Sequence, residues 1–145
     1  MKISIASDHN GVMLKEKIKD FLSNLGYEVT DLGSNDSQSV DYPKYAFEVG
    51  KNVNSNKSQL GILICGTGIG MSIACNKIKG IRCAKVSNIE EAKLSRQHNN
   101  ANVIAISSKC PTWKLKKIIK TFIETPFSNE ERHIRRNQLI DDYSD

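Results

Sequence analysis

The sequence predicts an α/β protein: a single doubly wound domain, residues 1–145, in which helices flank a five-stranded parallel sheet. Its 145 residues match the length of one ordinary domain, without an internal repeat or a linker. Short β-rich segments alternate with helical segments along the chain, which is the order that builds a parallel sheet. The segment LGILIC, residues 60–65, is apolar on both faces. Such a strand is typical of the centre of a sheet that helices cover on both sides.

The first half of the chain predicts two strands, each followed by a helix. They are a strand at 2–6 (KISIA), a helix from Leu14 to about Gly26, a strand at 27–33 (YEVTDLG) and a helix from about Pro43 to Val53. Leu14, Ile18, Phe21, Leu22 and Leu25 have the spacing of one helical face. Gly26 suits the position that ends a helix, and Pro43 suits the first position of one.

The second half continues the alternation. Its elements are the strand at 60–65, a helix that follows a glycine-rich loop and ends near Gly80, a strand at 81–86 (IRCAKV), a helix at 88–98 (NIEEAKLSRQH), a strand at 102–107 (NVIAIS), a helix around the apolar stripe at 115–123 and a basic helix at about 128–144. The last helix has only a weak apolar stripe, formed by Ile134, Leu139 and Ile140. We expect it to dock on a partner subunit rather than to complete its own core.

Composition and charge narrow the class of protein. Hydrophobic residues make up 39% of the chain and charged residues 26%, as in soluble globular domains. The formal net charge is +5 and the pI about 9.0, but the basic residues are scattered, so the charge alone selects no partner. No basic run is interleaved with aromatic residues, which argues against nucleic-acid binding.

The start of the chain and the cysteines indicate a cytoplasmic protein. The opening MKISIASDHNG has too short an apolar run for a signal peptide. No stretch approaches the roughly 20 apolar residues that a membrane helix needs. No CxxC motif is present, so neither a disulfide framework nor a zinc site is expected. The four cysteines are Cys65, Cys75, Cys83 and Cys110.

Three polar clusters are candidates for a ligand site, because ligands of open parallel sheets bind outside the carboxyl ends of the strands. The clusters are Ser7-Asp8-His9-Asn10 after the first strand, Cys65-Gly66-Thr67-Gly68-Ile69-Gly70 after the strand at 60–65, and Ser95-Arg96-Gln97-His98-Asn99-Asn100 before the last strand. The third cluster lies at a helix end, so its assignment to this edge of the sheet rests on less than the other two.

The glycine loop and its thiol each have two interpretations. Glycines between a strand and a helix let backbone N–H groups face an anion, but they also suit a tight turn, and the spacing does not choose. The loop matches neither GxGxxG nor a phosphate-binding ATPase loop. Cys65, beside a helix N-terminus, could have a lowered pKa and act as a nucleophile or base. A small apolar filler is the commoner role for such a cysteine.

Histidines and arginines add further candidates. His9 and His98 both lie in polar surroundings at the presumed ligand edge, although a lone surface histidine usually has no special role. Arg132 and Arg136 are four residues apart and project from one helix face, next to His133 and Arg135. A guanidinium pair fits a phosphate, and a solvated basic face is the ordinary alternative.

Together these segments resemble the ribose-5-phosphate isomerase type B family. The resemblance is carried by SDHNG (7–11), DYP (41–43), GILICGTGIGMSIACNK (61–77), LSRQHNNANV (94–103) and ERHIRR (131–136). It covers nearly the whole chain, and CGTGxG followed by SRQHN is a specific combination. The wider family also contains galactose-6-phosphate isomerase subunits, but SRQHN favours the ribose branch.

The resemblance implies a Rossmann-like fold and an aldose–ketose isomerase of the pentose phosphate pathway. The enzyme would interconvert ribose 5-phosphate and ribulose 5-phosphate without a metal or other cofactor. It would work as a homodimer, or a homotetramer, whose sites are shared between subunits. The implied partner is a small sugar phosphate, with no nucleic acid and no membrane.

The resemblance also implies roles for the candidate residues. Cys65 would move a proton between C1 and C2 through an enediolate, with Thr67 orienting or assisting it. His98, helped by Asp8, would open the furanose ring. The implied substrate contacts are Gly66, Gly68 and Gly70 as the anion hole, Tyr42 and Asn99 at the sugar, and His9, Arg132 and Arg136 at the phosphate.

This assignment explains why a thiol stands against a glycine loop. A proton beside a carbonyl is weakly acidic, so its removal needs a base and a stabilised oxyanion. Glycine lets the backbone approach the substrate closely. Lys109 departs from the family, since many members have an arginine there; lysine keeps the charge but loses the bidentate geometry. Arg135 is a candidate to compensate.

Two other functions remain open from the sequence. A 6-phosphohexose isomerase, acting on galactose or allose 6-phosphate, would keep the mechanism and change the length of the pocket. A non-catalytic module that binds a sugar phosphate would need no base, so the set of Cys65, Thr67, Asp8 and His98 argues against it.

Overall fold

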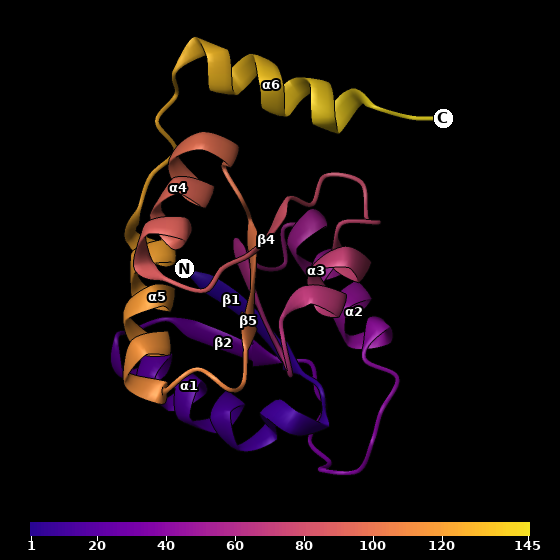
Figure 1. Ribbon diagram of the computed structural model, residues 1–145, viewed down its shortest axis with the longest axis vertical. Helices are drawn as coiled ribbons and strands as arrows, with labels where there is room; N and C mark the ends of the chain where they lie inside the picture. Colours follow the sequence, from indigo (N-terminus) through magenta and orange to yellow (C-terminus); the bar gives the residue numbers. More distant parts are fainter.

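The computed structural model describes residues 1–145 and confirms the five-stranded parallel sheet (Figure 1). The strands are β1 (Lys2–Ser7), β2 (Glu28–Asp31), β3 (Leu60–Cys65), β4 (Cys83–Lys85) and β5 (Val103–Ser107). Their order in the sheet is β2-β1-β3-β5-β4, and every pair is parallel. The chain therefore leaves β1 in one direction and returns to build β3 on its other side. A crevice is expected between these two strands, at their carboxyl ends.

Helices cover both faces of this sheet, as predicted. The helices are η1 (His9–Gly11), α1 (Val12–Asn24), α2 (Pro43–Asn54), α3 (Ile69–Cys75), α4 (Ile89–Asn99), α5 (Thr112–Glu124) and α6 (Glu131–Asp142). α1, α4 and α5 lie on one face, and α2 and α3 on the other (Figure 1). β3 is buried throughout: Ile62 and Ile64 join the first core, and Leu63 and Cys65 the second. β3 is therefore apolar on both faces because helices cover both sides of the sheet at this central strand, as the sequence predicted.

Two helices differ from their predicted form. α3 ends at Cys75, before the predicted end near Gly80, because the side chain of Asn76 exchanges two hydrogen bonds with the backbone of Cys83 and turns the chain toward β4. In α1 the buried face contains Lys15 with Ile18 and Leu22, whereas Leu25 follows the helix and is 42% exposed.

The last helix does not complete the core of its own chain. α6 lies beyond the end of α4, at the opposite end of the molecule from α1 (Figure 1). Of its residues only His133 and Asn137 are buried. Ile134, Leu139 and Ile140 are 48%, 67% and 55% exposed, and docking of this helix on a partner subunit stays a prediction. No helix of the chain has the length and apolar character needed to cross a membrane.

Candidate active site

A cavity of about 240 Å³ lies at the carboxyl ends of β1 and β3, where the sheet topology predicts a ligand site. It is lined by Asp8, Asn10, Tyr42, Cys65, Gly66, Thr67 and Gly70. The structure thus brings together six of the predicted site residues, from the first two polar clusters and the start of α2. Asn10 belongs to the first predicted cluster, but the sequence assigned it no role of its own.

The thiol of Cys65 is held by the glycine loop. The backbone N–H of Gly68 donates to Cys65 Sγ at 3.0 Å, and only 5% of Cys65 is exposed. Gly68 has φ +81°, and a Cβ there would lie 3.2 Å from the backbone of Ala105 and Ile106, so both conformation and space require glycine. An N–H aimed at sulfur is the contact that a thiolate accepts best.

The hydroxyl hydrogen of Thr67, in the glycine loop, is available to a ligand. Thr67 Oγ1 accepts the N–H of Ile69 at 3.1 Å, which closes the turn into α3. A hydroxyl that accepts one hydrogen bond still has its own hydrogen to donate. The Thr67 side chain is exposed and lines the cavity, so it can donate to a ligand there.

Asp8 is fixed across the cavity from the loop. Its backbone N–H donates to Ile64 O at 3.0 Å, which ties the end of β1 to β3. Its carboxylate accepts the Asn10 N–H at 2.9 Å and Asn10 Nδ2 at 3.4 Å, and Asp8 is 6% exposed. Asn10 therefore orients this carboxylate. The next residue, His9, has a buried Nδ1 without a hydrogen-bond partner.

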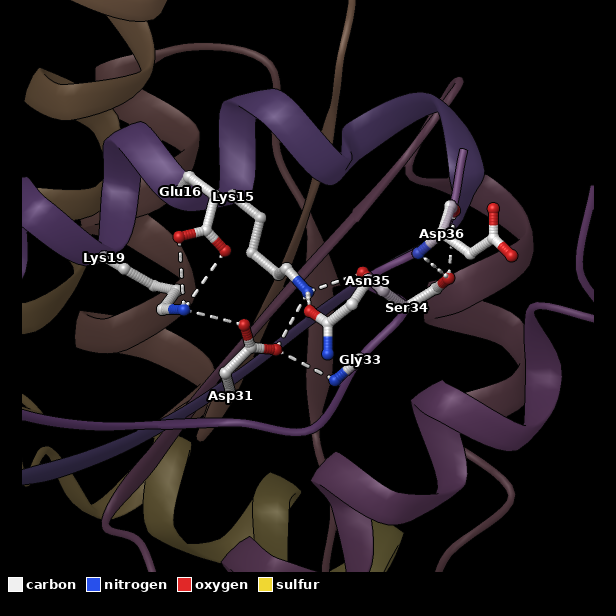
Figure 2. Close-up of polar contacts among 8 residues, drawn as sticks. All are labelled: Lys15, Glu16, Lys19, Asp31, Gly33, Ser34, Asn35 and Asp36. Atoms are coloured by element: carbon white, nitrogen blue, oxygen red, sulfur yellow. Dashed lines mark hydrogen bonds and ion pairs between the residues drawn. The ribbon is translucent and has the colours of Figure 1, made fainter. Parts of the chain in front are cut away.

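A buried lysine supports this side of the site, and Figure 2 shows its contacts with Asp31, Ser34 and Asn35. Lys15 is fully buried, and its Nζ donates to Asp31 Oδ1 at 2.8 Å, Ser34 O at 2.6 Å and Asn35 Oδ1 at 2.8 Å. Gly33 and Ser34 in turn pair with the backbone of Ser7, each at 2.7 Å. Lys15 thus fixes the segment beside Ser7, directly before Asp8.

Asp31 carries the charge that balances this lysine. Burial raises the pKa of Asp31, but hydrogen bonds from Lys15, Lys19 and the Gly33 N–H outweigh it, and the pKa lies below its usual value of 3.8. The hydrogen bond to Asp31 raises the pKa of Lys19 above 10.5 despite its partial burial. The sequence did not indicate this cluster, because a lysine at a buried position needs partners that lie far along the chain.

The third polar cluster lies at the other edge of the sheet, which corrects its predicted position. β5 is parallel to β3, with Val103 opposite Gly61 and Ser107 opposite Cys65. His98 and Asn99 precede Val103, so they lie at the amino end of β5. The four steps from Gly61 to Cys65 alone span about 13 Å at the usual rise of a strand. One chain therefore does not bring His98 and Asn99 to Cys65.

Two of the three phosphate candidates, Arg132 and Arg136, lie near His98, whereas His9 lies beside Asp8. The rings of His98 and His133 stack with centroids 4.3 Å apart. Burial, with the neighbouring His98 and Arg132, lowers the pKa of His133 below 6.5. Arg132 Nε approaches His133 Nε2 at 3.4 Å, and the guanidinium pairs with Glu130 at 3.2 Å. Both Arg132 and Arg136 are exposed on α6, so an anion can reach them, although Arg132 is paired with Glu130.

Two other cavities touch predicted residues. One of about 430 Å³, beneath α6, is lined by Asn99, Arg82 and Ile140 among others. One of about 260 Å³, at the carboxyl ends of β4 and β5, includes Lys109 and Ser107. Ser107 Oγ donates to Gly66 O at 2.7 Å, so Lys109 lies two residues from a direct contact with the glycine loop. No three His, Cys, Asp or Glu side chains gather as metal ligands would.

Comparisons with known proteins identify the family. The family model described as Ribose/Galactose Isomerase matches residues 3–140. A putative sugar phosphate isomerase of Bacillus subtilis is 45% identical over 147 residues, covering 100% of this chain and 98% of its own. Ribose-5-phosphate isomerase B of Escherichia coli is 46% identical over 118 residues, covering 81% of this chain and 79% of its own.

Solved structures agree in fold and in sequence. Ribose-5-phosphate isomerase B of Mycoplasma genitalium, solved with bound ribulose 5-phosphate, has a TM-score of 0.92 and 43% identity, covering 97% of this chain and 93% of its own. The Thermotoga maritima enzyme has a TM-score of 0.94 and 45% identity, covering 98% of each chain. With the five-stranded sheet and the glycine-loop thiol in place, the chain belongs to the ribose/galactose isomerase family.

Proposed function

We propose that this protein is a ribose-5-phosphate isomerase, which interconverts D-ribose 5-phosphate and D-ribulose 5-phosphate. Relatives and solved structures that carry this name span most of the chain, several of them at 43–46% identity. The observation that carries the proposal is the contact of Cys65 Sγ with the Gly68 N–H, in the cavity at the end of β3. A base and an oxyanion donor stand side by side there.

The reaction then follows from these groups. The Cys65 thiolate removes the C2 proton of the open aldose, and the electrons of that bond form an enediolate with its charge on O1. A proton passes from O2 to O1, for which the Thr67 hydroxyl is the nearest candidate. The thiol returns its proton to C1, which yields the ketose. No other reactant is consumed.

The glycine loop serves both anions in turn. Before the reaction the Gly68 N–H faces a thiolate, and the sulfur loses its charge when it takes the proton. The N–H groups between Gly66 and Gly70 then face the enediolate oxygen, where preorganised donors contribute most. Since the two charges do not coexist, one loop stabilises both.

The remaining residues require a second chain. His98, Asn99, Arg132 and Arg136 lie at the opposite edge of the sheet from Cys65. A two-fold homodimer brings the two edges together twice, because its interface places each patch against its counterpart. The exposed Ile134, Leu139 and Ile140 on α6 supply apolar area for such a contact.

In the assembled site each half has its own task. His98 of one chain, with Asp8 of the other, opens the furanose ring by acid–base catalysis. Tyr42 and Asn99 bind the sugar hydroxyls. His9, Arg132 and Arg136 hold the phosphate, and the unpaired Nδ1 of His9 leaves that group free for a ligand. The same role places the protein in a reducing cytoplasm, where Cys65 stays a free thiol.

A direct assay of ribulose 5-phosphate formation tests the proposal. The wild-type protein should isomerise ribose 5-phosphate and Cys65→Ala should not. Galactose and allose 6-phosphates, assayed in parallel, should react much more slowly. Faster turnover of a six-carbon substrate would assign the protein to the hexose branch. Binding of ribose 5-phosphate without any turnover would make it a binding module.

A further inference from the structure

Three successive carbonyl groups at the end of α4 each accept a hydrogen bond from a side chain outside the helix. Asn137 Nδ2 donates to His98 O at 3.0 Å. Arg82 Nε donates to Asn99 O at 2.7 Å, and Arg82 Nη2 to Asn100 O at 3.2 Å. These carbonyls belong to the segment that carries two proposed site residues, His98 and Asn99.

The last carbonyls of a helix have no partner within it, so side chains, water or ligands must satisfy them. The backbone N–H groups that follow α4 satisfy only carbonyls earlier in the helix: Asn100 N–H donates to Arg96 O, and Ala101 N–H to Ser95 O. Asn100 itself has φ +43°, in the left-handed region that a residue other than glycine adopts at a cost. External donors therefore set the peptide planes from which the His98 and Asn99 side chains project.

Arg82 also joins this segment to α6. Its Nη1 lies 2.6 and 2.7 Å from the two carboxylate oxygens of Asp141, and its backbone N–H donates to Asn102 Oδ1 at 2.9 Å. The side chain is only 15% exposed. Arg82 thus uses all three guanidinium nitrogens. Nη1 binds α6, which carries Arg132 and Arg136, and Nε and Nη2 bind the segment that carries His98.

We propose that Arg82 is a positioning residue for ring opening: it holds His98 and Asn99 at a fixed place relative to Arg132 and Arg136. The inference rests on the proposed isomerase function. One half of the site is then assembled within a single chain, before the partner's Cys65 half meets it. Lysine does not reproduce these contacts, because Arg82 makes them from three separate nitrogens of a planar guanidinium, whereas the hydrogens of an ammonium group all lie on one nitrogen.

The test separates ring opening from proton transfer. Ribulose 5-phosphate has no furanose form, so solvent hydrogen exchange from this ketose in a single turnover reports proton transfer, and formation of ring-closed ribose 5-phosphate reports the full reaction. Arg82→Lys should slow ring closure at least about tenfold, as loss of a well-placed acid–base group does, and exchange less than about twofold. Asp141→Asn leaves the contacts to Asn99 and Asn100, so it should raise KM for ribose 5-phosphate more than it lowers kcat.

Controls distinguish this role from general stability. Ile119→Val removes one methylene from the α5 core, so it should lower the melting temperature without a split between the two rates. If Arg82→Lys does not fold, Asn137→Asp removes the donor to His98 O without touching Arg82, and it should show the same split. Equal loss of exchange and ring closure, or no loss of either, would overturn the inference. A wild-type protein inactive on ribose 5-phosphate would instead overturn the proposed function, and this inference with it.

Discussion

The ring of Tyr42 occupies the space in which a side chain on Gly70 would lie. A Cβ built on Gly70 would stand 2.5 Å from the Tyr42 hydroxyl oxygen and 2.6 Å from its Cζ. Gly66 differs, because a Cβ there would meet nothing nearer than Asn10 Nδ2 at 3.7 Å. Glycine therefore serves two purposes in one loop: at 70 it admits a neighbouring ring, and at 66 it leaves the cavity open for the substrate.

We expect Gly70→Ala and Gly66→Ala to differ accordingly. Gly70→Ala must displace Tyr42, and overpacking of this kind costs about 1–3 kcal/mol, so both the melting temperature and the affinity for ribose 5-phosphate should fall. Gly66→Ala should leave the melting temperature within about 1 °C and still impair kcat, since only the substrate meets the added methyl group. Thermal unfolding and steady-state kinetics measure both. Equal melting temperatures for the two variants would refute the distinction.

Cys65→Ala should abolish isomerisation while the fold and ligand binding persist. A general base contributes roughly a hundred- to ten-thousand-fold, and no second base lines the glycine-loop side of the cavity. Alkylation of the thiol should inactivate the wild-type protein, and bound substrate should slow the alkylation. Cys110→Ala, at a more exposed thiol outside the cavity, is the control and should retain activity. Most of the wild-type rate surviving in Cys65→Ala would rule out the thiolate mechanism.

A mixture of two inactive variants should recover activity if sites are shared. In a heterodimer of Cys65→Ala and Arg136→Ala chains, one of the two sites carries neither defect. After subunit exchange, an equal mixture should therefore reach about a quarter of the wild-type activity, because half of the dimers are heterodimers with one intact site. Cys65→Ala mixed with Thr67→Ala should recover nothing if both act in the same half-site and each alone is inactive. No recovery in the first mixture, once exchange is confirmed by mass, would mean that each chain holds a complete site.

His98→Asn should slow reactions of cyclic ribose 5-phosphate far more than proton transfer. The residue lies at the end of α4 and away from the glycine loop, and ring opening is the step that the resemblance assigns to it. Hydrogen exchange from ribulose 5-phosphate in a single turnover should persist while ring closure of the product lags. Equal losses in both steps would show that His98 only shapes the pocket.

The Asp31 carboxylate should contribute to the fall in stability at acid pH. Its pKa in the folded protein lies below 3.8, so its contribution is present above that value and is lost as the pH falls through the folded pKa. Asp31→Asn should therefore lower stability near neutral pH and flatten its decline below about pH 4 in urea unfolding. Asp20→Asn, at an exposed carboxylate, should leave the profile unchanged. A wild-type slope in Asp31→Asn would contradict a stabilising role for the ion pairs of Asp31 with Lys15 and Lys19.

Lys19 should contribute to the fall in stability at alkaline pH. Its folded pKa is raised above 10.5, so its contribution is complete below that value and is lost as the pH rises through the folded pKa. Lys19→Met should flatten the alkaline decline in stability and leave the acid limb nearly as it is, because Lys15 still holds Asp31.

Local sequence patterns were sufficient to predict much of the secondary structure and of the core. The strand at Leu60–Cys65 has its predicted bounds, and Leu115, Ile118, Ile119, Phe122 and Ile123 are all buried as the stripe indicated. Each of these elements is determined by neighbours a few positions away. Lys15 escaped prediction because its acceptors lie 16 to 20 residues further along the chain, and nothing nearby marks a lysine for burial.

The misplaced third cluster has a topological cause. Residues after a parallel strand lie at its carboxyl end, whereas residues before it lie at its amino end. His98 and Asn99 precede β5 in the sequence, and the register of β5 with β3 puts them at the far edge. Their residue types suited a sugar site, but their order in the chain already separated them from Cys65.

The separation of the two half-sites makes turnover depend on how much protein is present. If neither half can act alone, the specific activity follows the fraction of chains that are dimers. It therefore falls when the protein is diluted below the dissociation constant of the dimer. Substrate contacts both halves and so draws the chains together, which favours the dimer whenever sugar phosphate is plentiful. At low protein concentration, progress curves would therefore begin with a lag, and the supply of pentose phosphate would set how much of the protein is assembled.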